Sequence, residues 1–410
     1  MSFQQGLSGL NAASKSLDVI GNNVANANTI GFKMSEAEFA DVFANSLNGS
    51  GGTQVGIGTT VRAISQEFSQ GNITVTNNPL DIAVNGKGFY RMSNNGAITY
   101  SRNGQFQLDK DGYVVNSENA RLTGYAASAA GVLDTSAPRD LRIAASDSMP
   151  SATTTVNATV NLDSRETPKG VAFSITNPNS YNSSTSVATF DSLGNSHTLS
   201  LYFARAAASN TWDVYAASDN ASVPLVSPAT PVGRLVFAGD GTLNRTASTM
   251  PAISVTGLTN GANNMSYTVD FTGTTQFGSA FGVNSLAQNG YTSGRLSGLN
   301  ISADGVIQGR YTNGQSSVLG QVTLANFANT QNLQPAGGNS WAETAESGAA
   351  MIGAPGSGTL GVLQSAAVED SNVDLTAELV NMITAQRVYQ ANAQSIKTQD
   401  AVLQTLVNLR

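Results

Sequence analysis

The chain has 410 residues, enough for roughly two to four domains, and its 20 basic and 27 acidic residues give a net charge of −7. Only 11% of the residues are charged, so the chain is not built to hold nucleic acid through phosphate contacts. The absence of cysteine excludes disulfides and thiolate chemistry, and a single histidine, His197, leaves little for a metal site or a general base.

The sequence gives no sign of a membrane segment. It contains no apolar run of about 18 residues, so we expect no insertion into a membrane. The first residues, MSFQQGLSGLNAASKSLDVIG, lack a basic start followed by a continuous apolar block, and we therefore expect no cleavable secretory signal. Residence in the cytoplasm and export by a route that recognises another signal both stay open.

Apolar residues recur with a helical period at the start of the chain. One row has a spacing of seven residues and two further residues lie beside it: Phe3, Leu10, Leu17 and Val24, with Leu7 and Ile20. Such a stripe predicts an amphipathic helix.

The end of the chain shows the same pattern over a longer stretch. The main row and its companion row, offset by four residues, are Leu375, Met382, Tyr389, Ile396 and Leu403, then Leu379, Ala393 and Val407. Gln386 and Asp400 interrupt the companion row, but no Gly or Pro occurs between Leu375 and Leu409. Ser371 followed by Asp374 is a reasonable helix start. The pattern predicts a helix of about 35 residues, or roughly 50 Å.

Two packing arrangements are open for these helices. A terminal helix could pack on its own globular domain, or the two termini could pair as a coiled coil and offer an apolar seam to neighbouring subunits. We call this predicted polymerisation surface the terminal seam. It consists of Phe3, Leu7, Leu10, Leu17, Val24, Leu375, Leu379, Met382, Tyr389, Ile396, Leu403 and Val407.

Between the termini the pattern changes to short β-strands. Turn residues separate them at Asn94-Asn95-Gly96, Asn103-Gly104, Asp111-Gly112, Asp304-Gly305 and Asn313-Gly314, where Gly and Asn accept positive φ. Predicted strands of the first block are 73–75, 80–84, 89–92, 98–102, 106–108 and 113–115. Residues 295–327 show the same pattern of short strands and turns. A further β block, 153–281, includes 187–190, 198–203 and 212–215.

The order of these blocks predicts nested, discontinuous domains. We expect a multidomain chain with mainly β outer domains and long α-helical termini that pair as a coiled coil. The expected divisions are a terminal helical domain (1–30 and 371–410), a connecting region (31–72 and 359–370), an inner β domain (73–146 and 288–358) and an inserted outer β domain (147–287).

Residues capable of catalysis are scarce. His197 follows Asp191 and Ser192 closely, but FDSLGNSHT is typical of a β-turn between two strands, so we interpret His197 as a hairpin-surface histidine. Asp109 and Asp111 lack the further oxygen ligands of a calcium loop and indicate a plain turn. Two short glycine motifs, 56–58 and 86–88, lack the rest of a phosphate-binding fingerprint and are interpreted as loops. We therefore expect no cofactor, no metal and no enzyme activity.

Several segments resemble the bacterial flagellar axial proteins of rod and hook. They are GNNVANANTIGFK (21–33), PLDIAVNGKGFY (79–90), YSRNGQFQLDKDGYVVN (100–116) and the tail SNVDLTAELVNMITAQRVYQANAQSIKTQDAVLQTLVNL (371–409). Within this family the large insert, with YNSSTSVATFDSLGNSHTLSLYF at 181–203, resembles the outer domain of the hook subunits. A distal rod protein is the alternative and would lack the insert, and an extracellular β-rich adhesin or enzyme is a more remote one.

The resemblance implies a structural subunit of the hook, a curved and flexible tube that acts as a universal joint and transmits torque from rod to filament. It implies that the subunit is exported unfolded by the flagellar type III apparatus without a cleaved signal peptide, and that it polymerises extracellularly under a cap. Its partners would be other copies of itself, the rod, the hook cap and the hook–filament junction proteins.

Two shorter segments carry expectations of their own. A family export motif, Phe followed after three residues by an apolar residue, matches Phe39 and Phe43, although an ordinary amphipathic turn also fits this short pattern. The Gly-rich stretch 45–54 is either a solvated connector or a loop that reaches an adjacent subunit and stiffens the hook.

Overall fold

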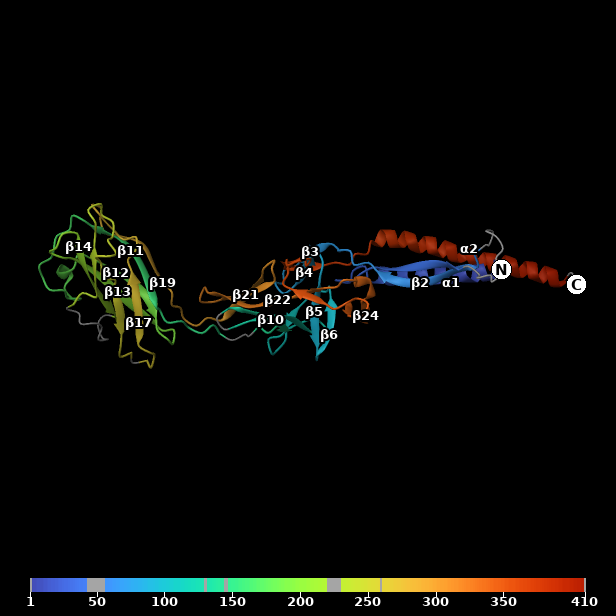
Figure 1. Ribbon diagram of the computed structural model, residues 1–410, viewed down its shortest axis with the longest axis horizontal. Helices are drawn as coiled ribbons and strands as arrows, with labels where there is room; N and C mark the ends of the chain where they lie inside the picture. Colours follow the sequence, from blue (N-terminus) through green and yellow to red (C-terminus); the bar gives the residue numbers. More distant parts are fainter. Residues whose placement is uncertain are drawn as a thin grey trace. The chain divides into compact units, whose positions relative to one another are not determined.

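The computed structural model describes residues 2–42, 56–128, 131–143, 147–219, 230–258 and 260–408. The chain divides into two compact units, and the second is inserted into the first. Unit 1 consists of residues 1–145, 298–310 and 316–410, and unit 2 consists of residues 146–297 and 311–315. The expected fold class is confirmed, since the chain is built mainly of β-sheets and its terminal helices are in contact (Figure 1).

The two helices, α1 (Ser2–Ala25) and α2 (Leu375–Asn408), come from opposite ends of the chain and lie side by side in unit 1. Asp374 caps α2, because its Oδ1 accepts hydrogen bonds from the backbone N–H groups of Thr376 (2.9 Å) and Ala377 (3.1 Å). These bonds satisfy donors that the first turn leaves without a helical partner. Neither described helix is long and apolar enough to cross a membrane.

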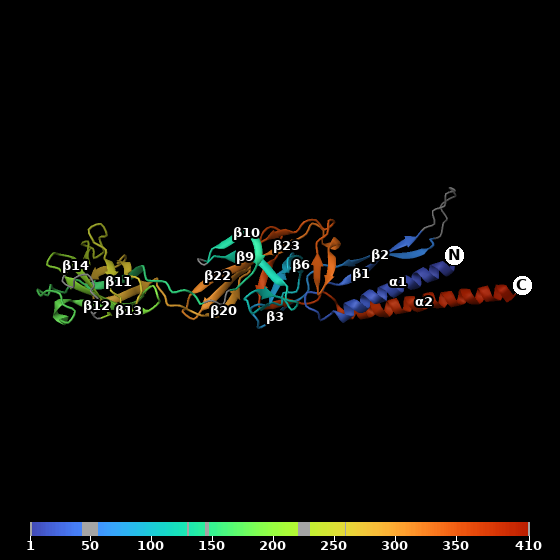
Figure 2. The same cartoon turned by 90° about the horizontal axis from the view of Figure 1, so that it is seen from below.

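A β-hairpin follows α1 and was not predicted from the sequence. Strand β1 (Ser35–Val42) pairs antiparallel with β2 (Gly58–Gln66), from Ser35 opposite Gln66 to Val42 opposite Gly58. Both strands contact α1 and lie alongside it (Figure 2). The segment 43–55, which contains Phe43 and the stretch 45–54, lies outside the described residues.

The largest sheet of the described chain has 13 strands, with the main path β20-β21-β22-β9-β5-β6-β25-β24. Its strands are β5 (Phe89–Asn94), β6 (Ala97–Ser101), β7 (Gln107–Leu108), β8 (Val114–Val115), β9 (Arg121–Ala127), β10 (Leu133–Asp140), β20 (Leu296–Ile301), β21 (Val306–Tyr311), β22 (Ser316–Val322), β23 (Leu324–Asn326), β24 (Gln334–Gly337), β25 (Ser340–Ala342) and β26 (Met351–Gly353), with the 3₁₀ turn η3 (Thr330–Asn332) before β24. Its aromatic core packs Phe89 edge to face against Phe327 and Trp341.

Two further strand pairs join distant parts of the chain within unit 1. Strand β3 (Ile73–Val75) pairs antiparallel with β28 (Ala367–Glu369), and β4 (Ile82–Asn85) pairs antiparallel with β27 (Val362–Ser365). The start and the end of the β region therefore depend on each other for their backbone hydrogen bonds.

Unit 2 has two sheets with a common core. One sheet has the order β16-β17-β11-β18, with β19 also paired to β11, and the other has the order β12-β13-β14-β15. The strands are β11 (Thr155–Asp163), β12 (Ser183–Phe190), β13 (Ser196–Arg205), β14 (Thr211–Ser218), β15 (Gly233–Val236), β16 (Ala252–Val255), β17 (Met265–Asp270), β18 (Thr275–Phe277) and β19 (Gly282–Gln288), with the 3₁₀ turn η1 (Pro178–Ser180) before β12. Alternate residues of both sheets, including Val156 and Ala158 on β11 and Leu199 and Leu201 on β13, are fully buried in one cluster.

Most of the predicted turns join paired strands. Asn95 and Gly96 adopt positive φ between β5 and β6, and Gly112 does so between β7 and β8. The Asn103-Gly104 hairpin was wrong, because the strands on either side of it do not pair with each other. A Cβ on Gly104 would lie 1.6 Å from the carbonyl oxygen of Ile82, so glycine is required there for a close backbone approach.

Candidate assembly interface

Small residues of α1 form the contact between the two helices. A Cβ on Gly6 would lie 3.1 Å from Cγ1 of Ile396, and a Cβ on Gly9 would lie 2.8 Å from Oδ1 of Asn392. At the other end, Asn23 of α1 lies beside Glu378 of α2. The helices are therefore antiparallel, and their backbones approach closely where α1 has glycine.

Most of the terminal seam stays exposed in this helix pairing, although Ile396, which lies next to Gly6, belongs to it. The buried apolar residues of α1 lie on another face and are Ala12, Ala13, Val19 and Ile20. The seam residues that remain exposed are Phe3, Leu7, Leu375, Leu379, Tyr389, Leu403 and Val407, and those partly buried are Leu10, Leu17, Val24, Met382 and Ile396. The exposed fraction of Leu403 is 54% and that of Val407 is 74%. So many exposed apolar side chains on two neighbouring helices indicate an interaction surface.

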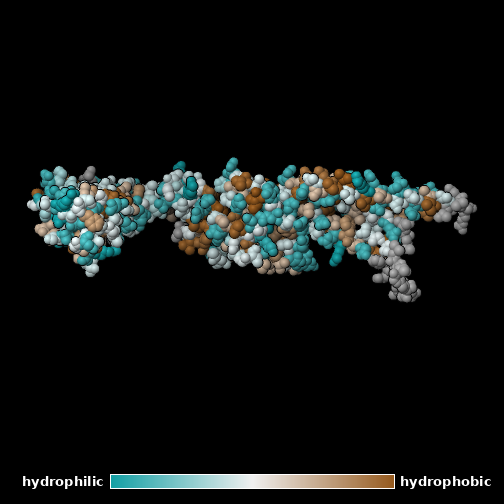
Figure 3. Space-filling model, turned by 90° about the horizontal axis from the view of Figure 1, so that it is seen from above, coloured by the Kyte–Doolittle hydropathy of each residue, from teal (hydrophilic) through white to brown (hydrophobic). Residues whose placement is uncertain are grey.

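The exposed apolar surface of α2 is wider than the predicted rows. Val380, Ile383, Val388 and Val402 are also exposed, although none of them was assigned to the terminal seam. Figure 3 shows hydrophobic groups gathered over the first turns of α2. The spacing of Val380, Ile383 and Val388 could have identified this second stripe beside the heptad row.

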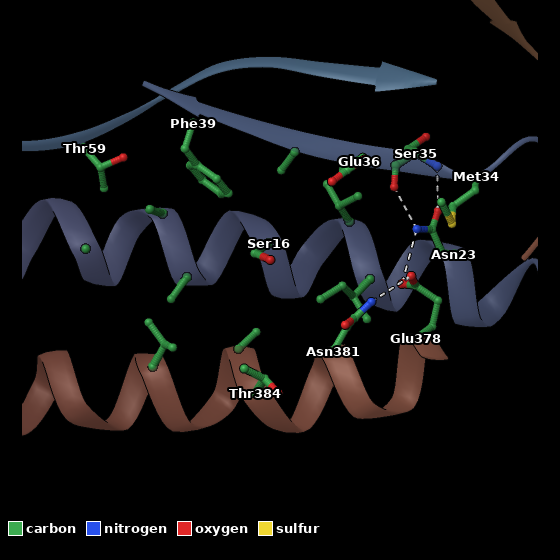
Figure 4. A pocket seen from close by; sticks show the side chains of 18 of the residues that line it. Ser16, Asn23, Met34, Ser35, Glu36, Phe39, Thr59, Glu378, Asn381 and Thr384 are labelled. Atoms are coloured by element: carbon green, nitrogen blue, oxygen red, sulfur yellow. Dashed lines mark hydrogen bonds between the residues drawn. The ribbon is translucent and has the colours of Figure 1, made fainter. Parts of the chain in front are cut away.

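A groove of about 730 Å³ runs between α1, α2 and β1. Its floor is formed by small residues of α1, including Gly9, Ala13 and Ser16, and Figure 4 shows α2 on one side and β1 on the other. Thr384 and Ala385 contribute to the α2 wall. Two successive elements, α1 and β1, form this groove together with the distant α2, and no single motif predicted it.

One end of the groove contains buried polar groups. The side-chain amide of Asn23 donates to the carbonyl oxygen of Ser35 (2.8 Å) and to Oε2 of Glu378 (3.4 Å), and its Oδ1 accepts from the backbone N–H of Ser35 (3.0 Å), as Figure 4 shows. Asn381 donates to Oε1 of Glu378 (3.4 Å). These bonds fix α1, α2 and the start of β1 relative to one another.

A buried ion-pair network lies where the terminal helices meet the β-sheets. Glu369, at the end of β28, accepts hydrogen bonds from Nζ of Lys33 (2.6 Å) and Nη1 of Arg102 (3.1 Å). Its Oε1 also accepts from the backbone N–H of Gly71 (2.9 Å). Nζ of Lys33 donates in addition to the carbonyl oxygen of Ser69 (2.7 Å). Three segments of unit 1 therefore converge on one carboxylate of a fourth segment.

Burial acts on the ionisable groups of this network. It lowers the pKa of Lys33, although the Glu369 carboxylate opposes that shift. It also raises the pKa of Tyr90, whose hydroxyl donates to the carbonyl oxygen of Ile82 (2.5 Å). Two cations share one buried anion, so the network depends strongly on Glu369.

The structure describes one of the two residues of the predicted export motif. Phe39 lies on β1 and is exposed, and Phe43 lies outside the described residues. The alternative of an ordinary amphipathic turn does not fit the described part of the motif, because residues 35–42 form a strand.

His197 lies next to a hairpin turn, as predicted, but the prediction that it lies on the surface was wrong. The residue lies on β13 next to the turn from β12, but only 9% of it is exposed. Its Nδ1 lies 2.5 Å from Oδ2 of Asp219 and its Nε2 lies 3.3 Å from Oδ2 of Asp191. Burial alone would lower the pKa of His197, but the hydrogen bonds to these carboxylates outweigh it and raise the pKa.

The cluster of His197, Asp191 and Asp219 has a structural role and is not a catalytic triad. Asp191 is fully occupied, because it also accepts hydrogen bonds from the backbone N–H groups of Leu193 (2.9 Å) and Asn195 (2.8 Å) and from the amide of Asn260 (2.6 Å). Ser192 instead accepts a hydrogen bond from the backbone of Asn263. The cluster joins three loops at one end of unit 2.

The other candidate motifs form ordinary loop structure. Oδ1 of Asp109 accepts hydrogen bonds from the backbone N–H groups of Asp111 (2.8 Å) and Tyr113 (2.7 Å), as in a plain turn. Gly86 and Gly88 lie in the loop between β4 and β5. Gly56 precedes β2, but Gly58 is the first residue of that strand and pairs with Val42, so the loop interpretation was wrong for Gly58. In the described part of the chain no group of three or more potential metal ligands comes together.

Four family models match the chain, and together they cover most of it. They are described as flagella basal body rod protein (residues 3–33), flagellar hook protein FlgE/F/G D1 domain (83–163), flagellar basal body protein FlaE D2 domain (161–291) and flagellar basal body rod FlgEFG protein C-terminal (364–409). The chain is thus a flagellar axial protein, a class of structural subunits.

Similar proteins show to which family of flagellar axial proteins the chain belongs. The chain is 43% identical to the flagellar hook protein FlgE of Escherichia coli (strain K12) over 415 residues, which cover 100% of both chains. It is 42% identical to that of Salmonella typhimurium and 33% identical to that of Rhizobium meliloti, again over 100% of this chain and over 100% and 98% of the relatives. The chain belongs to the flagellar hook protein family.

One solved structure also has a similar fold. The crystal structure of Helicobacter pylori flagellar hook protein FlgE2 is similar with a TM-score of 0.51 over 72% of this chain and 99% of that one, at 14% identity. Family membership makes the chain a structural, non-enzymatic subunit of the flagellar hook that self-assembles within the flagellum. The distal rod alternative is set aside, because the hook relatives match the chain along its whole length, including the insert.

Proposed function

We propose that the chain polymerises through its terminal seam into the curved, flexible tube of the hook, and that this tube acts as a universal joint between rod and filament. The observation that carries the proposal is the exposed apolar surface of paired helices, which the subunit itself leaves uncovered. A fully buried Leu or Val side chain contributes about 1.5 to 3 kcal/mol. Covering several of them between subunits favours assembly strongly.

A universal joint needs contacts that can exchange while the core of the tube holds. With 11% charged residues, the outer surfaces of the subunit are mainly polar and neutral. Neutral polar contacts exchange at small cost compared with breaking desolvated ion pairs. We therefore assign the holding contacts to the helices and the sliding contacts to the β-sheets.

The resemblance and the sequence also support a domain division and a route of delivery. We propose a helical domain (1–30 and 371–410), a connecting region (31–72 and 359–370), an inner β domain (73–146 and 288–358) and an outer β domain (147–287). The flagellar type III apparatus would export the chain without a cleaved signal peptide to the cell exterior, with Phe39 and Phe43 as its export motif. The rod, the hook cap and the hook–filament junction proteins would be its partners there.

Electron microscopy of the concentrated or salted-out chain tests polymerisation. Tubes of regular diameter are expected from the wild-type protein. Leu379→Asp places a charge in the terminal seam and is expected to abolish them, whereas the matched variant Leu193→Asp changes an exposed leucine in unit 2 and should leave them intact. Normal tubes from Leu379→Asp, or no tubes from the wild-type chain, would contradict the proposal.

A further inference from the structure

The antiparallel helices are staggered, so that among the described residues one end of α2 has no helix beside it. Gly6 lies next to Ile396, and beyond that point α1 continues only to Ser2 while α2 continues to Asn408. The difference is roughly eight residues, or about 12 Å of helix. We call residues 400–408 the free end of α2.

The free end is apolar and uncovered. Val402, Leu403 and Val407 are among the most exposed large apolar residues of the two helices. Leu403 and Val407 are four residues apart and therefore lie on the same face of the helix. This face is ready to pack against another surface.

The groove over α1 is an uncovered surface of matching form. Its wall on α2 extends from Glu378 to Asn392, which is about 21 Å of helix and longer than the free end. Its floor consists of Gly9, Ala13 and Ser16 among other small residues, which allow a helix to approach closely. Phe39 and Val388 add apolar surface to the walls.

One buried charge also faces this groove. The side chain of Glu378 lines it and only 6% of the residue is exposed. Among the described residues its carboxylate accepts hydrogen bonds from two side-chain amides, each at 3.4 Å. No ion pair with a lysine or arginine satisfies it among the described residues. The apolar face of a docking helix would therefore lie over the small residues of the floor and not over this carboxylate.

We propose that the groove formed by α1, α2 and β1 receives the free end of α2 from a second copy of the chain. The subunit's own free end cannot occupy it, because α2 is one continuous helix and points away from the groove past the start of α1. The inference rests on the proposed self-assembly and names the contact that propagates it.

Contact between the groove and the free end of α2 would explain why the polymer is open-ended. The groove and the free end are different parts of one chain, so their contact is head to tail. A head-to-tail contact whose rotation does not close a ring repeats without limit and produces a helical filament. Each bound copy presents its own groove or its own free end for the next one.

Crosslinking between two cysteine variants tests the contact, because the chain has no cysteine of its own. One copy carries Ser16→Cys on the floor of the groove, and an isotopically labelled copy carries Leu403→Cys. The copies are mixed, assembled into tubes and treated with a short bis-maleimide, and mass spectrometry identifies the linked peptides. The matched control replaces Ser16→Cys by Lys15→Cys, which lies on the same helix and does not line the groove.

We expect links from residue 16 to residue 403 in tubes and severalfold fewer from residue 15. Tubes without that preference would overturn the inference and leave the proposed function intact. Absence of tubes in the unmodified wild-type chain would overturn the proposed function, and the inference would fall with it.

A second measurement does not depend on the reagent. Leu403→Asp is expected to raise the protein concentration needed for tube formation by roughly tenfold or more, because it places a charge on the docking face. Thr405→Asp adds the same charge to the opposite face of the same turn and should change that concentration little. Equal effects of the two variants would overturn the inference, and so would an unchanged concentration for Leu403→Asp.

Discussion

Lys33 and Glu369 form a fully buried ion pair, with Nζ of the lysine 2.6 Å from Oε1 of the glutamate, although 336 residues separate them in the sequence. Lys33 lies between α1 and β1, and Glu369 ends the last β-strand before α2. The pair therefore fastens both terminal segments to the β-sheets of unit 1. It also explains why two otherwise unrelated segments of the sequence contain a buried charge.

Replacing Glu369 by Gln is expected to destabilise unit 1 by about 3 to 5 kcal/mol, because Lys33 and Arg102 would stay buried without their anion. The chain has one tryptophan in each unit, Trp341 in unit 1 and Trp212 in unit 2. In a Trp212→Phe background, the fluorescence of Trp341 during denaturant unfolding reports on unit 1.

The matched control is Asp18→Asn in the same background. It breaks the exposed ion pair between Asp18 and Lys15 and should change stability by less than about 0.5 kcal/mol. An equally small change for Glu369→Gln would show that the network contributes little to stability.

Unit 2 is expected to lose stability as the pH rises above neutrality. Asp219 and Asp191 raise the pKa of His197 above its ordinary value of 6.5, so the folded state holds the proton more tightly than the unfolded state. The stabilisation is complete below pH 6.5 and disappears as the pH rises through the raised pKa. Denaturation midpoints between pH 6 and 9, followed by Trp212 in a Trp341→Phe background, measure it.

His197→Gln removes the titrating group and should flatten this profile. Tyr267, which faces the same region, has a pKa raised to about 12 by burial and does not titrate in that range. A wild-type profile as flat as that of His197→Gln would contradict the assignment of a charged His197.

Trimming both ends should give a folded core that does not polymerise. The fragment 66–371 keeps Phe68, which packs on Phe89 and Trp341, and keeps all strands from β3 to β28. It lacks α1 and α2, so we expect a monomer without tubes in electron microscopy. In the full chain, limited proteolysis should remove the free end of α2 before it attacks the β-sheets.

A shorter fragment, 66–360, provides the comparison. It lacks β27 and β28, which pair with β4 and β3, and it also lacks Glu369. Its thermal unfolding should occur at a clearly lower temperature than that of 66–371. Equal melting temperatures would mean that the last two strands contribute nothing to unit 1.

Ala366→Gly is expected to stabilise unit 1 by up to about 1 kcal/mol. Ala366 has a φ of 54°, a left-handed conformation that costs a residue with a Cβ about 1 to 2 kcal/mol. Part of that gain is lost, because glycine is more flexible in the unfolded chain. The denaturation midpoint reported by Trp341 measures the difference.

The neighbouring variant Ala367→Gly is the control, because Ala367 is buried in β28 and its φ is not positive. It should destabilise the same unit. A loss of stability in both variants would contradict the strain assigned to Ala366.

Local patterns in the sequence predicted the regular elements well. The apolar rows and Asp374 placed α2 within a residue of its observed ends, and glycine turns such as Asn95-Gly96 bounded β5 and β6. These features depend on near neighbours in the chain, which a sequence displays directly. The β1–β2 hairpin was missed because most of its residues are partly or fully exposed, so no strict alternation of apolar and polar residues marks it.

Long-range contacts could not be predicted in the same way. The residues around Lys33 do not indicate that Glu369 is its partner. Likewise, the burial of His197 depends on Asp219, which follows β14. The groove needs α1, α2 and β1 together, so it exists only in the folded chain. The roles of the terminal seam and of Phe39 in assembly and export stay predictions.

The pairing of β3 with β28 and of β4 with β27 is expected to form late in folding. Each pair closes a chain segment of more than 270 residues, since Ile82 lies opposite Ser365 and Ile73 lies opposite Glu369. Contacts between residues so distant in the sequence form slowly, because the chain must lose loop-closure entropy before the contacts contribute any stabilisation. A chain that emerges gradually from a narrow passage, whichever end leads, cannot complete unit 1 until most of its length is free.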